Sequence, residues 1–264
     1  MSGRDARVVV HRVGALRDVA VPRLRIAMVA DLHACSPGMG PARIARIVSQ
    51  VNALGADLIC LMGDYPGHTL GTRTLTPDQV VPLLAKLRAP MGVLSIFGNH
   101  DWLDDPPARR AEIRDSHWHR AFRDAGMTTL CNAVTVLRKD GTEIALAGLE
   151  SQMAYGRKNP GADDFGRVAG LLDPRRFTIL LAHEPDIFPD LPDHVDLTLS
   201  GHMHGGQVRL FGRSFYCPSR HGTRYDLGHF REGTRQLVVS GGLGNSMLPI
   251  RIGMPPEITV VETG

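Results

Sequence analysis

An α/β layered fold is the class that this 264-residue sequence predicts, and two observations carry the prediction. Short apolar runs recur along the chain and each stops at glycine or at polar residues, which is typical of buried strands. Segments with helical periodicity lie between the first of these runs, in the order strand, helix, strand. The length and the hydrophobic content of 43% suit one large domain or two small ones with ample core.

Eight of the apolar runs are expected to form strands. Five of them end directly in Asp, His or Asn, and these are residues 25–30 (RIAMVA), 57–63 (DLICLMG), 92–98 (GVLSIFG), 177–182 (FTILLA) and 195–201 (VDLTLSG). The other three are residues 143–148 (EIALAG), 236–241 (QLVVSG) and 257–261 (EITVV).

Three helices are expected between these strands. The first covers residues 41–55, where apolar residues recur at helical spacing between an initial proline and a final glycine. The second opens at a capping box, Thr76 to Gln79, and continues to about Leu87. The third covers residues 107–125, and its inward-facing side chains are expected to be Ile113, Trp118 and Phe122. Residues 151–164 are expected to form a loop that acts as a mobile rim.

Charge and cysteine content limit the class of protein. The net charge is +3 and no dense basic run occurs, so specific nucleic-acid binding is not indicated. The four cysteines are spread out with no CxxC pair, which favours a reducing compartment. We find neither a signal-peptide pattern nor an apolar stretch long enough to span a bilayer. The expected location is the cytoplasm, and a peripheral contact with a membrane is left open.

The five strand ends carry residue types that bind divalent metal ions. Ligand sites in open α/β sheets lie beyond the carboxyl ends of the strands. Carboxylate, imidazole and amide oxygen suit Mn²⁺, Fe, Zn²⁺ or Mg²⁺, and the absence of thiolate argues against a structural zinc site. Any one of these residues alone is more often structural, but five strand ends of the same chemistry favour a metal centre. The candidates are Asp31, His33, Asp64, Asn99, His100, Asp101, His183, His202 and His204.

Two pairs of these candidates share the same spacing. Asp31 and His33 are two residues apart, as are His202 and His204, so their side chains point the same way if the backbone is extended. Glycines flank the second pair, where they allow a sharp turn and the close approach of a substrate.

The candidates outnumber the ligands that one ion needs. Asp64 is the best candidate to bridge two ions, which at a separation of about 3.5–4 Å clamp a phosphoryl group and lower the pKa of a water between them. The resulting hydroxide would attack phosphorus in line, and a nearby acid would protonate the leaving oxygen. The sequence contains no G-x-S-x-G or Walker motif that would offer another mechanism.

These motifs, in this order, resemble the calcineurin-like metallophosphoesterases. They are DLH (31–33), GD (63–64), GNHD (98–101), His183 and GHMH (201–204). The segments GHMHGGQVRLFG, SRHGTRYDLGHF and SGGLGNSMLPIRIGMPPEI extend the similarity to residues 24–261 and are similar to a bacterial subgroup of membrane-associated or peripheral phosphodiesterases. Many members of that subgroup have arginine where Gly241 stands, and often an N-terminal transmembrane segment that we do not find here.

The resemblance implies a fold and a role for each residue. The fold would be a four-layer α/β/β/α sandwich forming a single domain over residues 1–264. His100 would be the acid near the leaving group, with Asp101 orienting its ring. The first metal would be held by Asp31, His33 and His204, the second by Asn99, His183 and His202, and Asp64 would bridge them.

The resemblance further implies a hydrolase with two divalent metal ions, Mn²⁺ being the first candidate and Fe, Zn²⁺ or Mg²⁺ the alternatives. A phosphodiesterase is the leading hypothesis, acting on a phosphodiester or a pyrophosphate in a small molecule or a lipid-linked compound. The alternatives are a UDP-diacylglucosamine pyrophosphatase of lipid A synthesis, a cyclic-nucleotide phosphodiesterase or nuclease, and a non-catalytic scaffold. His221 and Arg224 follow the last metal-binding motif and are candidates for substrate contact.

Three further features are given structural roles. His117 and His119 are expected to be exposed on a helix, and Cys35 to be a small buried residue. The apolar segment 243–256 is expected to pack against the sheet rather than to face a membrane or an acyl chain.

Overall fold

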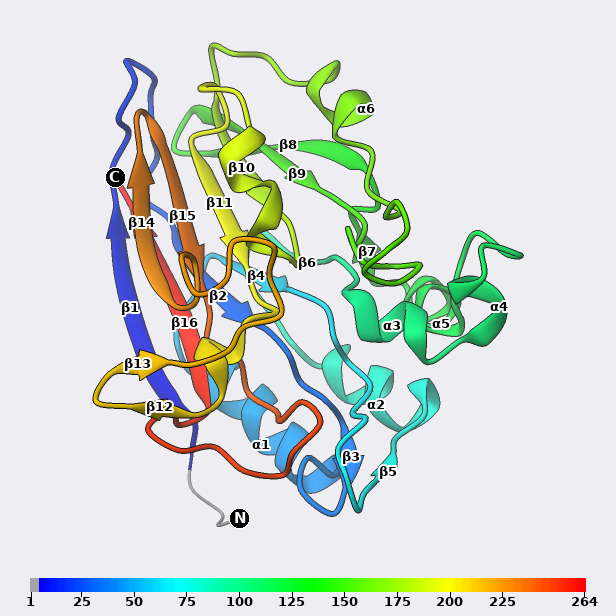
Figure 1. Ribbon diagram of the computed structural model, residues 1–264. Coiled ribbons are helices and arrows are strands. Elements are labelled where there is room, and N and C mark those ends of the chain that lie inside the picture. The colour runs from blue at the N-terminus through cyan, green and yellow to red at the C-terminus, as the bar shows by residue number, and fades with distance from the viewer. Residues whose placement is uncertain (1–4) are drawn as a thin grey trace.

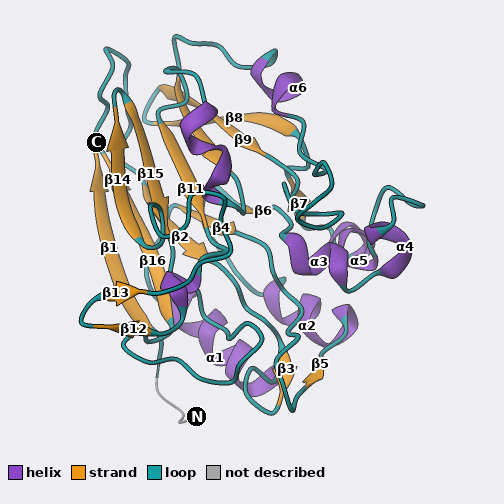
Figure 2. Ribbon diagram, viewed as in Figure 1, coloured by secondary structure: helices purple, strands orange, loops and turns teal. Residues whose placement is uncertain are grey.

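A computed structural model describes residues 5–264 and has two six-stranded sheets packed face to face (Figure 1). Helices lie on the outer side of each sheet (Figure 2), so the predicted four-layer α/β/β/α sandwich is confirmed. The two sheets are mixed rather than purely parallel, because antiparallel pairs stand among their parallel ones.

The first sheet carries three of the five predicted site strands in its parallel part. Strand β16 is antiparallel to β2, and the other neighbours in this sheet are parallel. Its order is β1 (Arg7–Val13), β16 (Glu257–Thr263), β2 (Arg25–Val29), β4 (Leu58–Leu61), β6 (Val93–Ser95) and β7 (Thr128–Thr129).

The second sheet carries the other two site strands at its centre. Its four inner strands are parallel, and an antiparallel strand closes each edge. Its order is β14 (Gly228–Glu232), β15 (Arg235–Val239), β11 (Leu197–Ser200), β10 (Phe177–Leu181), β9 (Thr142–Gly148) and β8 (Ala133–Lys139).

Three apolar clusters hold the layers together. The central one joins the facing sides of the sheets, with Ile26, Leu58 and Ile179 among its fully buried members. The second lies between the first sheet and α1 (Pro41–Asn52), α2 (Pro77–Leu84) and α5 (His117–Asp124). The third covers the second sheet with α6 (Phe165–Ala169) and a 3₁₀ helix over Pro185–Asp190, so this outer layer is thin.

The remaining elements are short. They are β3 (Cys35–Ser36) paired with β5 (Arg73–Thr74), the hairpin of β12 (Arg209–Leu210) and β13 (Arg213–Ser214), α3 (Asn99–Leu103), α4 (Pro106–Arg109) and a 3₁₀ turn at His204–Gly206.

All eight predicted strands are present, but three long strands were missed. These are β1, β8 and β14, and each lies at the edge of a sheet. Edge strands bury only part of their surface, so most of their side chains are exposed or half-buried. Their short apolar stretches stand beside polar or charged residues, so no longer apolar run marks them.

The prediction of one helix over residues 107–125 is wrong. The chain instead forms α4, a turn over residues 110–116, and α5. Ser116 is the N-cap of α5, a position that serine favours, so a new helix starts there. Trp118 and Phe122 are buried as predicted, whereas Ile113 lies in the turn and is exposed. The capping box of α2 is confirmed, since Gln79 Oε1 accepts a hydrogen bond from the Thr76 N–H.

The central cluster predicts that the same kind of truncation costs much more stability at a buried strand position than at an exposed one. Ile179→Ala should lower the free energy of unfolding by about 2–5 kcal/mol, because it leaves a cavity between the sheets. Val136→Ala on β8 is the matched control and should cost less than about 1 kcal/mol, because Val136 is exposed. Urea unfolding followed by circular dichroism measures both, and equal losses would contradict the packing described here.

Candidate metal centre

Five loops from the two sheets meet at one edge of the sandwich. Strands β2, β4 and β6 of the first sheet lead into Asp31, Asp64 and Asn99. Strands β10 and β11 of the second sheet lead into His183 and His202. In Figure 1 the arrows of β2 and β11, one from each sheet, both run downward and end near the middle of the view. The sandwich thus brings together side chains that are as much as 173 residues apart, the separation of Asp31 and His204 in the sequence.

The backbone at these loops is left-handed rather than extended. Five of the predicted ligands have positive φ angles, namely Asp31 (53°), His33 (46°), Asp64 (57°), His202 (67°) and His204 (51°). This corrects the expectation that an extended backbone aligns each pair. Non-glycine residues adopt this conformation at a cost of order 1 kcal/mol or more, and they do so mainly where the surroundings hold them in place.

Glycines allow the loops of the two sheets to approach closely. A Cβ on Gly98 would overlap Asp64 Oδ1 and lie 2.6 Å from His183 Nε2. A Cβ on Gly201 would lie 2.7 Å from Asp31 Oδ2. Gly205 and Gly206 have φ angles of 57° and 74° and form the sharp turn that we predicted there. We expected these glycines to make room for a substrate. At Gly201 the group that comes close is instead the carboxylate of Asp31.

The ligand-type atoms form two clusters that a third one links. Within each cluster the atoms lie no more than 4.8 Å apart. The first is Asp31, His33 and His204, the second is Asp64, His183 and His202, and the linking one is His33, Asp64 and His100. Asp64 joins the two, because its Oδ2 lies 3.6 Å from His33 Nε2 and 3.2 Å from His183 Nε2. His204 Nε2 lies 3.6 Å from Asp31 Oδ1 and 2.9 Å from His33 Nε2.

Three buried polar atoms in this place have no hydrogen-bond partner among the described residues. They are Asp31 Oδ2, Asn99 Oδ1 and His183 Nε2, which follow different strands. The 3.2 Å approach of His183 Nε2 to Asp64 Oδ2 is an ion-pair contact without hydrogen-bond geometry. Buried polar atoms are nearly always satisfied, so such a group requires a partner that the polypeptide does not supply. Two oxygens and an imidazole nitrogen are donors that suit a divalent cation, and the residues fit a metal centre.

Burial sets the charge state of most of the histidines. It lowers the pKa of His33 to about 3 and holds the pKa of His202 and of His204 below the usual histidine value. Neutral imidazole is the form that binds metal ions.

The carboxylates favour a positive charge at the centre. Burial raises the pKa of Asp31 to about 7. Burial disfavours the charges of Asp64 and His183 too, but their mutual attraction outweighs it. The pKa of Asp64 is therefore well below, and that of His183 well above, its usual value. A cation at this place would meet the same attraction.

Asp101 fixes the loops rather than the ring of His100. We expected its carboxylate to orient that ring. It instead accepts three backbone N–H bonds, from Gly98 at 2.7 Å and from Asp64 and Tyr65 at 2.9 Å each. The expected contact is corrected accordingly, because both oxygens of Asp101 are engaged by the backbone of the β4 and β6 loops.

His68 and Asp104, rather than Asp101, support the ring of His100. His68 Nδ1 lies 3.0 Å from His100 Nδ1, and His68 Nε2 lies 3.1 Å from Asp104 Oδ1. Asp104 Oδ2 in turn accepts hydrogen bonds from His117 Nε2 and Trp118 Nε1, each at 2.9 Å. Sequence reasoning missed this series of contacts because His68 and Asp104 follow the ligand motifs by four and three residues, without a pattern of their own.

Arg251 is a second residue that sequence reasoning missed. Its Nη2 lies 3.0 Å from His204 Nδ1, and its Nη1 donates to the Gly241 carbonyl at 2.8 Å. A Cβ at Gly241 would lie 2.0 Å from Met254 Cε, so a larger residue at this position requires the methionine side chain to move. Burial lowers the pKa of Arg251 to about 10, so it still carries its charge at neutral pH.

The structure does not bring His221 and Arg224 into the cluster. His221 Nε2 lies 3.3 Å from the Asp186 carbonyl, and Arg224 Nη2 donates to Glu232 at 2.6 Å. Their loop is nevertheless close, since the Pro218 carbonyl lies 3.2 Å from His202 Nε2. Both residues have protein partners, and their contact with substrate stays a prediction.

Two expectations about other polar residues are also resolved. His119 is buried rather than exposed, where it stacks on Phe97 and lies 3.2 Å from Glu150. His117 is half-buried and bound to Asp104. Cys35 is a small buried residue as expected.

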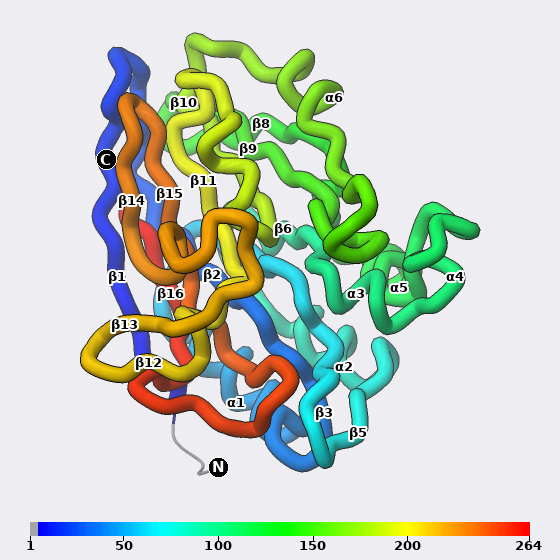
Figure 3. The backbone as a smooth tube through the Cα atoms, viewed as in Figure 1, coloured from blue at the N-terminus to red at the C-terminus, as the bar shows by residue number. Residues whose placement is uncertain are grey.

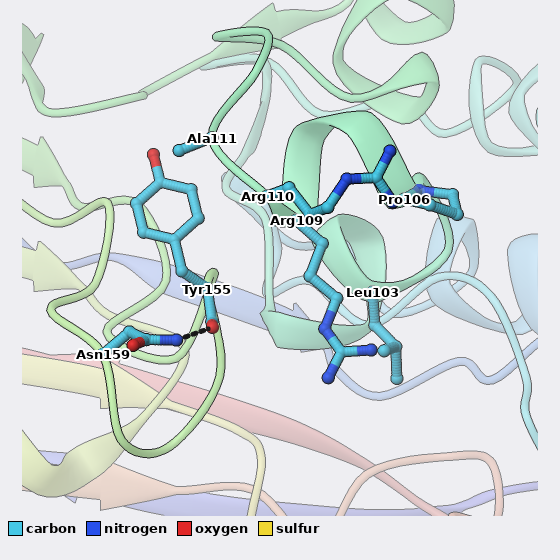
Figure 4. A pocket seen from close by; sticks show the side chains of 7 residues that line it. All are labelled: Leu103, Pro106, Arg109, Arg110, Ala111, Tyr155 and Asn159. Atoms are coloured by element: carbon cyan, nitrogen blue, oxygen red, sulfur yellow. Dashed lines mark hydrogen bonds between the residues drawn. The ribbon is translucent and has the colours of Figure 1, made fainter.

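Two cavities differ in their relation to the ligand cluster. The larger, about 680 Å³, is bounded by Arg109, Arg110, Tyr155 and Asn159 on α4 and the 151–164 loop (Figure 4), and no predicted ligand lines it. The smaller, about 290 Å³, is lined by His33 together with Leu70, Asn245 and Pro249. The smaller cavity is thus the one that reaches the ligand cluster.

Comparison with known proteins decides the family. The model of the calcineurin-like phosphoesterase family matches residues 24–206. The chain belongs to this family. It is therefore a metallophosphoesterase, a phosphoric ester hydrolase of a family that uses divalent metals, as the motifs predicted. No helix within residues 5–264 has both the length and the apolar content to cross a membrane.

Relatives with the same domain come from several bacteria. The chain is 35% identical to the uncharacterized metallophosphoesterase YkuE of Bacillus subtilis, over 82% of this chain and 71% of that one. It is 32% identical to the phosphodiesterase YaeI of Escherichia coli, over 96% of this chain and 86% of that one. It is 26% identical to the UDP-2,3-diacylglucosamine pyrophosphatase LpxG of Chlamydia trachomatis, over 90% and 83%.

Because the loops pack closely at Gly98, we predict that a side chain at this position weakens metal binding. Gly98→Ala should weaken Mn²⁺ binding by about 10–100-fold, because the new methyl group displaces Asp64 and His183. Gly170→Ala is the matched control, since Gly170 has a φ of −65° and its nearest neighbour would be 3.6 Å away. Isothermal titration of metal-stripped protein measures both. Unchanged affinity in folded Gly98→Ala would show that these side chains do not hold the metal.

Proposed function

We propose that this protein is a divalent-metal-dependent phosphodiesterase with a two-ion centre. The observation that carries the proposal is the set of three unpartnered buried atoms, Asp31 Oδ2, Asn99 Oδ1 and His183 Nε2, at the point where the two sheets meet. The similarity to the phosphodiesterase YaeI over 96% of the chain supports diesters as the substrate class.

We assign the ligands as follows. Asp64 would bridge the two ions, and its position between His33 and His183 supports that role. Asp31, His33 and His204 would hold the first ion, and Asn99, His183 and His202 the second. Mn²⁺ is the first candidate, because carboxylate, imidazole and amide donors without thiolate suit it, and Fe, Zn²⁺ and Mg²⁺ are the alternatives.

Divalent ions at this place supply Lewis-acid polarisation of the phosphoryl oxygens and lower the pKa of a nearby water. The protein's own contribution is to hold the ligands before substrate arrives. The Asp64 carboxylate is fixed by the His100 N–H at 2.8 Å, and its backbone by Asp101. Preorganised charge of this kind does not have to reorient during the reaction.

His100 is the acid in this proposal. Its Nδ1 faces His68, so Nε2 is the atom left to meet substrate. As the bond between phosphorus and the leaving oxygen breaks, Nε2 would give its proton to that oxygen, which requires the imidazolium form of His100. Burial lowers the pKa of this ring, and the nearby Asp64 carboxylate opposes that effect. His68 and Asp104 position the ring, and Arg251, charged and close to His204, adds attraction for an anionic phosphate.

Metal reconstitution tests the function. Metal-stripped protein re-loaded with Mn²⁺ should hydrolyse bis-p-nitrophenyl phosphate faster than p-nitrophenyl phosphate. Asp64→Asn should lower that activity by about 10²–10³-fold, because the bridging charge is removed. Asp173→Asn, at an exposed ion pair with Arg175, is the control and should keep full activity. Faster cleavage of the monoester would make the protein a phosphatase, and activity that survives Asp64→Asn would refute the two-ion centre.

The His68 contact predicts a leaving-group effect. His68→Ala should lower kcat by about tenfold or more for a diester with phenol as leaving group, because the His100 ring loses its support. The loss should be smaller for p-nitrophenol, a better leaving group that needs less protonation. His229→Ala, whose ring contacts Gln236 on the far edge of the second sheet, is the matched control. Equal losses for both leaving groups would assign His68 a merely structural role.

A further inference from the structure

Large apolar side chains are exposed on three loops beside the ligand cluster. Phe211 at the tip of the β12–β13 hairpin is fully exposed, and Leu70 and Met247 are each 72% exposed. Others on the same loops are Leu210, Phe215, Leu248, Ile250 and Ile252. Single exposed apolar residues are ordinary, but a group of them at one place marks an interaction surface.

The expectation that segment 243–256 packs against the sheet is wrong for its middle part. Leu243 and Met254 at its two ends are buried. Between them, Met247, Leu248 and Ile250 are exposed. The ends anchor the segment, and the part between them presents its apolar side chains outward.

Backbone hydrogen bonds join the three loops into one surface. The Leu70 N–H donates to the Met247 carbonyl at 2.7 Å, which ties the loop after β4 to segment 245–256. The Arg209 N–H donates to the Ile252 carbonyl at 2.8 Å, which ties that segment to the hairpin. Figure 3 shows the hairpin, the 245–256 loop and the β3–β5 region along the lower edge of the molecule. The apolar side chains therefore sit on a framework with fixed spacing.

The charges of this surface have one sign. Residues 66–75, 207–216 and 244–256 contain no Asp or Glu, and their charged residues are Arg73, Arg209, Arg213 and Arg251. Arg209 is paired with Asp226, and Arg251 lies at His204. Arg73 and Arg213 are exposed and form no ion pair among residues 5–264. Apolar side chains flanked by arginine complement an anionic lipid bilayer, whose headgroups attract the arginines while the apolar groups enter the interface.

Two of the three loops border the smaller cavity. Leu70 and Pro249 line that cavity together with His33. A protein that rests on a bilayer through these loops would hold its ligand cluster next to the lipid headgroups.

We propose that Leu70, Leu210, Phe211, Met247, Leu248, Ile250 and Ile252, with Arg73 and Arg213, form a membrane-docking surface that binds an anionic lipid bilayer. A second copy of the chain fits less well as the occupant, because two such surfaces would place arginines against arginines. The uniform positive charge and the projecting hairpin tip favour an anionic bilayer as the partner of this surface.

Co-sedimentation with vesicles tests the surface using the full chain. The protein should bind vesicles of phosphatidylglycerol and phosphatidylcholine, and added salt should weaken the binding. Phe211→Ser combined with Met247→Ser should weaken it by at least about tenfold, since two large apolar side chains are lost from the interface. Arg213→Ala should weaken it by about fivefold. Val136→Ser combined with Leu171→Ser, which changes two exposed apolar residues outside the three loops, is the matched control and should bind as the wild type does.

The outcomes separate this proposal from the proposed function. Hydrolysis of soluble bis-p-nitrophenyl phosphate should be unchanged in all these variants, so lost vesicle binding with intact hydrolysis supports the docking surface. The proposal is overturned if the wild type does not bind the anionic vesicles or binds phosphatidylcholine alone equally well. It is also overturned if the control loses as much binding, or if light scattering shows a wild-type dimer that the Phe211/Met247 variant dissociates.

Discussion

The buried carboxylate of Asp64 is the group on which the rest of the site depends. A carboxylate without exposure to water costs several kcal/mol unless charges and hydrogen bonds compensate it. Here the compensation comes from both sheets, through the His100 N–H on the first and the His183 ring on the second. The two sheets must therefore end at the same edge, which requires the parallel arrangement of β2, β4 and β6 and of β10 and β11.

Bringing these loops together strains the backbone. Asp31, His33, Asp64, His202 and His204 all adopt left-handed conformations that L-residues avoid. Gly98 and Gly201 leave room for carboxylates where a methyl group would not fit. Asp101 binds three backbone N–H groups and so holds two of these loops together. The central apolar cluster supplies the rigidity against which the loops are held.

The sequence predicted the centre of this molecule better than its edges. Inner strands are buried on both faces and appear as continuous apolar runs, and the ligand residues follow those runs directly. Edge strands such as β1 and β8 are mostly exposed or half-buried, and their short apolar stretches beside polar or charged residues gave no such signal. The left-handed backbone of the ligand loops could not be predicted from the sequence either. Asp31 and His33 adopt positive φ angles that these residue types disfavour. His68, Asp104 and Arg251 were missed because their proximity to the site arises only from the tertiary fold.

The proposed chemistry depends on two ions bridged by Asp64. Electron paramagnetic resonance of metal-stripped protein titrated with Mn²⁺ tests for such a pair. We expect two ions to bind per chain and the spectrum to be the broad multiline signal of two exchange-coupled Mn²⁺ ions. A simple six-line spectrum at saturation, with one ion per chain or with two uncoupled ions, would contradict it.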